Sequence, residues 1–239
     1  MGECDLHLLH APYFDGPDRD LTIDIRTKIR YSYSYIESAV VKIGDDTFQV
    51  SSYGDYMLNG VSRADLANAT ISDFPIVHSH PMERVHQFEI QVSGEEKIVL
   101  KTFKDMVSVN VQKAEAQRFH GSLGMMGQFE TGKLMAPDGK TIISDPNALA
   151  AQWQVRQDEP SYFQVKRAPQ HPQPCKLPLD GADGGLEGIK ARRRRLGASV
   201  IEKDAAEVAC AGWPKEMKEM CVHDTMAAGD LGLAKAGFF

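Results

Sequence analysis

The sequence has few cysteines, no long apolar run and little net charge, and each shortage argues against a class of protein. Four cysteines in 239 residues are too few for a small domain held by disulfides. The absence of Cys-x-x-Cys removes the usual redox and zinc-knuckle motifs. No apolar stretch approaches the roughly 18 residues that a membrane-spanning helix needs. A net charge of −6 argues against a nucleic-acid binder, which requires a broad basic face.

Recognisable catalytic motifs are also missing. The chain contains no Gly-x-Ser-x-Gly elbow, no His-Glu-x-x-His helix and no phosphate-binding loop. Cys221 and His223 are close in sequence, but a Cys–His dyad is normally assembled across a fold, so we interpret them as a disulfide cysteine beside a helical surface histidine. We therefore predict a non-catalytic protein. The alternative is a hydrolase whose catalytic residues are scattered along the chain.

Apolar and polar residues alternate over the first roughly 155 residues, as they do in half-buried strands. The odd positions of residues 21–29 are apolar or threonine, whereas Asp24, Arg26 and Lys28 lie on the opposite face. Similar segments follow, and turn sequences such as Asn59-Gly60 separate them. These segments lie near residues 41–50, 56–58, 88–92, 98–100 and 107–111. The spacing predicts a mainly β protein, built as an antiparallel sandwich or meander.

The pattern becomes helical after residue 144. Asp145-Pro146 is a good helix start, and the helix would carry Leu149 and Trp153 on one face. Further on, Ser199–Glu202 fits a capping box and Pro214 opens a second helix. The predicted organisation is a β domain, a Pro-, Gly- and Arg-rich connector and a helical tail that contains cysteines. Their bounds are 1–158, 159–198 and 199–239.

Five motifs in order resemble a von Willebrand factor type D domain. Gly121-Ser-Leu-Gly124-Met-Met-Gly127-Gln-Phe129 is followed by Ala136-Pro-Asp-Gly139 and then by Trp153-Gln-Val155. The family has a Gly-Leu-Cys-Gly-Asn-aromatic motif, then a Pro-Asp/Ser-Gly turn, and then a helix ending in Trp-x-Val. Ser38–Gly44 and Tyr56–Val61 resemble an upstream hairpin of the family, and Gly2-Glu-Cys4 resembles its Gly-x-Cys element. The resemblance covers residues 2–156.

The resemblance implies an extracellular structural module that serves adhesion, matrix assembly or protein–protein binding. Its partners would be other extracellular proteins or itself, and it would present the loops Ser62–Met82 and Leu123–Lys140. The family's opening Gly-Asp-Pro-His strand is missing, so we expect Met1 to be internal and a signal peptide to lie upstream. Asn68-Ala-Thr70 is a glycosylation candidate in a predicted loop. The predicted structural residues are Gly124, Gly127, Gly139 and Trp153.

The cysteines depart from the family pattern. Leu123 and Met126 replace the two cysteines of the family's turn, which leaves Cys4 without its usual partner. The tail resembles the Cys-rich helical segment that follows some type D domains, which implies a Cys210–Cys221 pair. Alternatively, Cys175 closes a longer loop with one of these cysteines. The sequence alone does not choose among the three possible pairings.

The family's calcium ligands are largely absent. Type D domains hold Ca²⁺ with Asp and Asn oxygens, and Ca²⁺ requires six to eight oxygen ligands. Here Gln128 and Glu130 stand where the family has Asp-Asp-Phe. They are the candidate ligands if Ca²⁺ binds, and we expect no other cofactor.

Two further features allow sharper interpretations. His78 and His80 lie on one side of an extended segment with His86 nearby, so the alternative function is a secreted metal- or carbohydrate-binding module. The competing interpretation, which we favour, is a polar loop between strands. Arg192–Arg195 is a processing site, a nuclear-localisation patch, a polyanion contact or a solvated charge run in a flexible connector. The tail methionines Met217, Met220 and Met226 are expected to pack in a small core.

Overall fold

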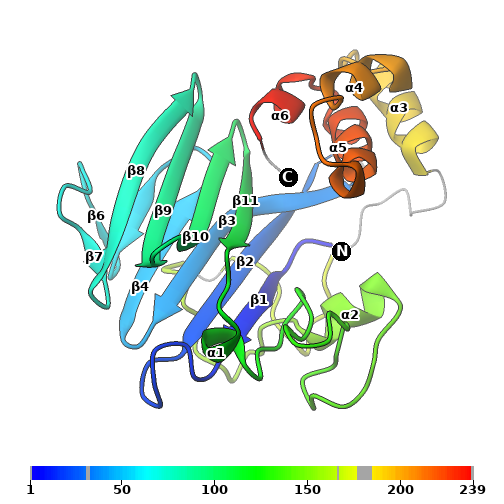
Figure 1. Cartoon of the computed structure of the whole chain (residues 1–239). Coiled ribbons are helices and arrows are strands. Elements are labelled where there is room, and N and C mark those ends of the chain that lie inside the picture. Colours follow the sequence, from blue (N-terminus) through cyan, green and yellow to red (C-terminus); the bar gives the residue numbers. More distant parts are fainter. Residues whose placement is uncertain (1, 31–32, 166, 177–184, 238–239) are drawn as a thin grey trace. The chain divides into compact units, whose positions relative to one another are not determined.

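Two antiparallel sheets dominate the regular structure, with about twice as much strand as helix, so the predicted mainly β fold is confirmed (Figure 1). This is a computed structural model, and it describes residues 2–30, 33–165, 167–176 and 185–237. The chain separates into two compact units. The first comprises Met1–Lys28 and Tyr35–Lys176, and the second comprises Ile29–Ser34 and Leu177–Phe239.

Both sheets are meanders, in which each strand pairs with its neighbours in the sequence. The six-stranded sheet contains β1 to β6, which span Asp5–Ala11, Leu21–Arg30, Tyr33–Ile43, Asp46–Ser51, Tyr56–Leu58 and Val61–Ser62. The five-stranded sheet has the order β11-β10-β9-β8-β7. From β7 to β11 these strands span Thr70–Ile71, Phe74–Met82, Val85–Ser93, Glu96–Phe103 and Met106–Gln112. Short hairpins suffice for these connections, as the turn sequences predict.

The hydrophobic core lies between the two sheets. Phe48 on β4 and Phe88 on β9 meet edge to face, with ring centroids 5.7 Å apart. The alternating residues that predicted the strands supply about half of the buried side chains of this core. They include Leu21, Ile23, Ile25, Val41, Ile43, Phe48, Val50, Phe88, Ile90, Ile98, Leu100 and Val107.

Strand β2 differs from the prediction because both of its faces are buried. Asp24 and Arg26, which we expected to face solvent, are only 1% and 6% exposed. The segment that follows residue 155 covers them, and the centroid of the Phe163 ring lies 4.5 Å from the Arg26 guanidinium carbon. Because this covering segment belongs to the first unit, the unit extends beyond the predicted boundary at residue 158 and ends at Lys176.

The glycine-rich turn extends the edge of the first sheet. The backbones of Leu123 and His10 exchange two hydrogen bonds, of 2.7 and 2.9 Å, and the Met126 N–H donates to the Leu8 carbonyl over 3.0 Å. Gly124 has a φ of +144°, and a Cβ there would overlap the Leu8 carbonyl. Position 124 therefore requires glycine so that the turn can approach β1 closely.

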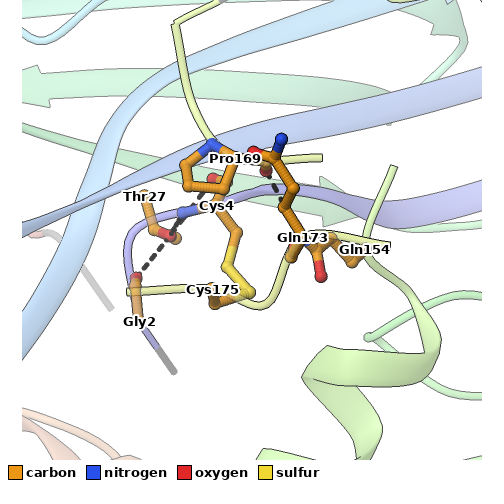
Figure 2. The surroundings of a disulfide bond; sticks show 7 residues. All are labelled: Gly2, Cys4, Thr27, Gln154, Pro169, Gln173 and Cys175. Atoms are coloured by element: carbon orange, nitrogen blue, oxygen red, sulfur yellow. Dashed lines mark hydrogen bonds between the residues drawn. A yellow bond between two sulfur atoms is a disulfide. The ribbon is translucent and has the colours of Figure 1, made fainter. Parts of the chain in front are cut away.

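A disulfide between Cys4 and Cys175 ties the start of β1 to the end of the first unit (Figure 2). Thr27 lies beside this disulfide, where its hydroxyl accepts from the Cys4 N–H and donates to the Gly2 carbonyl over 2.7 Å. The buried Gln154 amide donates to the Pro169 and Gln173 carbonyls, which positions the segment that carries Cys175. The type D resemblance left Cys4 without its usual partner, and the structure pairs it with Cys175, which lies outside the type D motifs.

Two short helices complete the first unit, α1 (Ala116–Phe119) and α2 (Pro146–Gln152). The Asp145 carboxylate caps α2 by accepting from the Asn147 and Ala148 N–H groups, as predicted. Leu149 and Trp153 are both buried, and the Trp153 indole donates to the Met135 carbonyl over 2.8 Å. The helix therefore packs its predicted apolar face into the unit.

The second unit is helical and is closed by a disulfide between Cys210 and Cys221. Its helices α3 to α6 span Gly185–Arg195, Lys203–Ala209, Lys215–Ala228 and Gly232–Lys235. Met226 packs beside the disulfide, but Met220 is 51% exposed, so the expectation that all three methionines are core is wrong. The capping box is also wrong, because α4 begins after Glu202 and the Ser199 hydroxyl instead donates to the Gly229 carbonyl.

The predicted connector is partly helical. Residues 166 and 177–184 lie outside the described residues, whereas α3 occupies 185–195. Arg193 is 5% exposed and donates to the Ser199 and Ala227 carbonyls, and Arg194 pairs with Glu202 at 3.0 Å. Hydrogen bonds to carbonyls inside the unit therefore hold the Arg193 guanidinium, whereas Arg194 and Arg195 are exposed on the same helix.

Candidate functional site

Three histidines come together at one end of the β8–β9 hairpin. His78 Nε2 lies 3.2 Å from His86 Nδ1, and one ring nitrogen from each of His78, His80 and His86 falls within 4.8 Å of the others. The expected loop is therefore a strand, since His78 and His80 belong to β8 and His86 belongs to β9. The expectation that His78 and His80 share one side of an extended segment holds.

Strand register explains why the third histidine joins them. His78 pairs with Phe88 and Ser79 with Gln87, but then Met82 pairs with Val85, so β8 has a bulge opposite His86. Side chains at alternate positions of paired strands share a face. The three imidazoles therefore continue the face that carries the buried Phe88, at the point where the core ends.

Residues of the opposite sheet complete the surroundings. The Tyr56 ring of β5 lies 5.7 Å from the His78 ring, and Gly54 in the preceding turn faces His86. A Cβ at Gly54, whose φ is +86°, would overlap the His86 ring, so glycine makes room for the imidazole. An open pocket of about 660 Å³ borders all three histidines and also Asp65.

The surroundings of His78 and His86 lower the pKa of both imidazoles. Burial lowers the pKa of His78, and the neighbouring His80 and His86 lower it further. Burial and His80 likewise lower the pKa of His86, against the opposing charge of Asp55. Neutral imidazole is the form that binds a metal ion, so these shifts favour the binding form of His78 and His86.

The predicted calcium ligands are engaged with the protein itself. Glu130 accepts a hydrogen bond of 2.6 Å from the Gly121 N–H and pairs with His120 at 2.8 Å, and these contacts lower its pKa. The Gln128 side-chain oxygen accepts from the Thr131 hydroxyl over 2.9 Å. Among the described residues, no acidic ligand cluster that would suit Ca²⁺ forms around Gln128 and Glu130.

Of the two segments predicted to be exposed binding loops, one is partly β-strand and the other is a loop. Of Ser62–Met82, residues 70–71 form β7 and residues 74–82 form β8, so that the loop is confined mainly to residues 63–69. Asn68 is exposed in this loop. Leu123–Lys140 is loop, as expected, and contains Gly127 and Gly139 at turns. Strand β8 was overlooked because Ile76 is its one fully buried residue, which leaves no alternating apolar pattern.

The structure also places the Cys221 and His223 pair and the arginine run Arg192–Arg195. Cys221 is bonded to Cys210 and has no free thiol, so it does not form a nucleophilic dyad with His223. The His223 imidazole instead contacts Asp224 at 3.1 Å. Arg192–Arg195 lies on α3, as described above for the second unit.

Sequence reasoning missed a buried charged cluster on the outer face of β1 and β2. Cross-strand pairing places His7 opposite Asp24, and the His7 ring bridges Asp24 at 2.7 Å and Glu159 at 3.2 Å. Burial opposes the charge on His7, but these hydrogen bonds and carboxylates outweigh it and raise the His7 pKa to about 9. The alternation of Asp24 and Arg26 was visible in the sequence, whereas the strand register and the cover over them were not.

This histidine gives folding a pH dependence. Because the folded pKa lies above the ordinary value of 6.5, the stabilisation is complete below pH 6.5 and is lost as the pH rises through about 9. We expect the free energy of unfolding of the β unit to fall by about 3–3.5 kcal/mol over this window, because the pKa difference is about 2.5 units and each unit corresponds to ~1.4 kcal/mol. Denaturant titrations at several pH values measure it. The His7→Gln variant should flatten the profile, and an equally steep profile in that variant would contradict the assignment.

Comparison of the sequence with known proteins identifies no family for this chain. A scan against protein-family models gives no match, and a search of curated proteins gives none either. The type D resemblance therefore remains a prediction from sequence motifs. Two disulfides indicate an oxidising environment. Within the described residues, no helix combines the length and apolarity that crossing a membrane requires.

Proposed function

We propose that this chain is an extracellular, non-catalytic interaction module, in which a β-sandwich of type D kind presents loops to a protein partner. Two lines support the proposal. All four cysteines are in disulfides, as is usual in secreted proteins. The ordered motifs that resemble the type D family supply the functional class. The partner is another extracellular protein or a second copy of this chain.

The loop Leu123–Lys140 is the surface that carries the proposal. Met126 and Phe129 are 46% and 42% exposed, although the surrounding backbone is fixed against β1. The Gln128 N–H also donates to the Lys133 carbonyl, which closes the loop on itself. Exposed large apolar side chains on a preorganised backbone suit a binding surface, because little conformational entropy is lost on binding.

The Met126→Ser/Phe129→Ser variant tests this surface. We expect the variant to lose at least tenfold in affinity, in whichever of two assays detects binding by the wild type. The reason is that interface energy concentrates in a few buried apolar anchors. The assays are self-association by sedimentation velocity and binding to a panel of purified extracellular matrix proteins. The free energy of unfolding should change by only about 1 kcal/mol, since both side chains are already half exposed.

Val208→Ser is the matched control, because Val208 is 78% exposed on α4 in the second unit. It should leave binding unchanged. Wild-type chain that stays monomeric and binds no matrix protein would contradict the proposal. So would turnover in a screen of hydrolase substrates that survives purification to homogeneity.

A further inference from the structure

We propose that His78, His80 and His86 form a binding site for a divalent transition-metal ion of the Zn²⁺ type, on the rim between the two sheets. This site is separate from the loop Leu123–Lys140, and its test does not depend on partner binding. The inference rests on the arrangement of three imidazoles where a sandwich would otherwise place apolar side chains.

The nitrogen separations suit a small tetrahedral ion. Zinc–nitrogen bonds of 2.0–2.1 Å at tetrahedral angles place two ligand nitrogens about 3.3 Å apart. His78 Nε2 and His86 Nδ1 are already 3.2 Å apart, and the farthest pair in the cluster lies within 4.8 Å. His80 is exposed on the bulged part of β8, so rotation about its side-chain bonds brings the third nitrogen to the same point.

The donor set selects the class of metal. Three imidazoles suit Zn²⁺, Cu²⁺ or Ni²⁺, whereas Ca²⁺ and Mg²⁺ require several carboxylate or carbonyl oxygens. The cluster of described residues contains no cysteine and no carboxylate. Three protein ligands leave a fourth coordination position for water, and the pocket of about 660 Å³ provides access to it.

The surroundings hold two of the ligands in place. The His78 ring stacks on the Phe88 ring at 4.3 Å with an interplanar angle of 11°, and the buried Phe88 is fixed by the core. Gly54 packs against the His86 ring. Such support reduces the entropy lost when the ligands are ordered around an ion.

Calorimetric titration of the tag-free chain with Zn²⁺ is the primary test. We expect one ion per chain, with a dissociation constant in the micromolar range or below, and no competition from excess Ca²⁺ or Mg²⁺. His78→Gln, His80→Gln and His86→Gln should each weaken binding at least tenfold. His223→Gln is the matched control, since His223 lies beside Asp224 on the other unit and is the kind of pair that binds zinc adventitiously.

A second measurement needs no variant and so avoids any loss of folding. Diethyl pyrocarbonate modifies accessible imidazoles, and mass spectrometry locates the modified residues. Added Zn²⁺ should protect His78, His80 and His86 but not His223. Binding no tighter than tens of micromolar, tight binding that persists in all three glutamine variants, or protection elsewhere in the chain would each overturn the proposal.

Discussion

The Cys4→Ser/Cys175→Ser double variant is expected to lose about 4–5 kcal/mol of the free energy of unfolding of the β unit. The bond joins residues that are 171 positions apart, so its removal releases a long closed loop in the unfolded chain. In the chain-entropy account a loop of about 100 residues is already worth ~4.7 kcal/mol. Urea titration of the wild type and the double variant measures the difference.

The other disulfide provides a matched comparison. Cys210 and Cys221 are 11 positions apart, so the same account gives only about 3 kcal/mol for Cys210→Ser/Cys221→Ser. That loss should be confined to the helical unit, because both cysteines lie in its core. Serine at both positions of a pair avoids free thiols. If the Cys4 and Cys175 variant were the more stable of the two, the loop-closure argument would be wrong.

The pairing of Cys4 also shows where a sequence resemblance stops being informative. The type D motifs direct attention to the turn at 123–126, where the family's cysteines are replaced by Leu123 and Met126. In the structure this turn still docks on β1, through backbone hydrogen bonds that any residue can make. The partner cysteine instead comes from the segment after residue 155, which crosses the outer face of β2. Its path depends on tertiary packing, which leaves no periodic signal in the sequence.

Alternation in the sequence predicts a strand most clearly where only one face of the strand is buried. Alternation identified β4, β9 and β11, whose apolar residues mostly face a single core, and it also identified β10, in which Val99 and Phe103 are buried on the second face. Strand β8 carries Pro81 and three exposed or half-exposed polar positions toward its end, so its pattern resembles a loop. The opposite error occurred at β2, where Asp24 and Arg26 look solvated in the sequence but are buried, Arg26 beneath Phe163 and Asp24 against His7.

The sequence predicted only part of the candidate histidine site. The i, i+2 spacing of His78 and His80 correctly placed two imidazoles on one side of an extended segment. Placing His86 beside them depends on the β8–β9 hairpin and its bulge. Placing Tyr56 and Gly54 there depends on how the opposite sheet packs. Such relations between distant segments follow from strand register and sheet packing, and a single sequence does not contain them.

The buried ion pair between Asp5 and Arg26 gives the second large expected effect. Arg26 donates to both Asp5 oxygens at 2.7 and 2.8 Å, and the two side chains are 0% and 7% exposed. Asp5→Ala should cost about 3–5 kcal/mol, because it leaves an unpaired guanidinium out of contact with water. Phe163, which lies over Arg26, cannot replace the lost carboxylate. Urea titration measures the loss.

Two comparisons show whether burial is the cause. Glu37→Gln removes one partner of the Lys28–Glu37 pair, in which the lysine is 50% exposed, and should cost under about 1 kcal/mol. The double variant Asp5→Leu/Arg26→Met replaces both buried charges with apolar groups, and should recover most of the stability that Asp5→Ala loses. If the double variant were less stable than Asp5→Ala, the pair would be stabilising in its own right. The cost of the single substitution would then not come from an uncompensated charge.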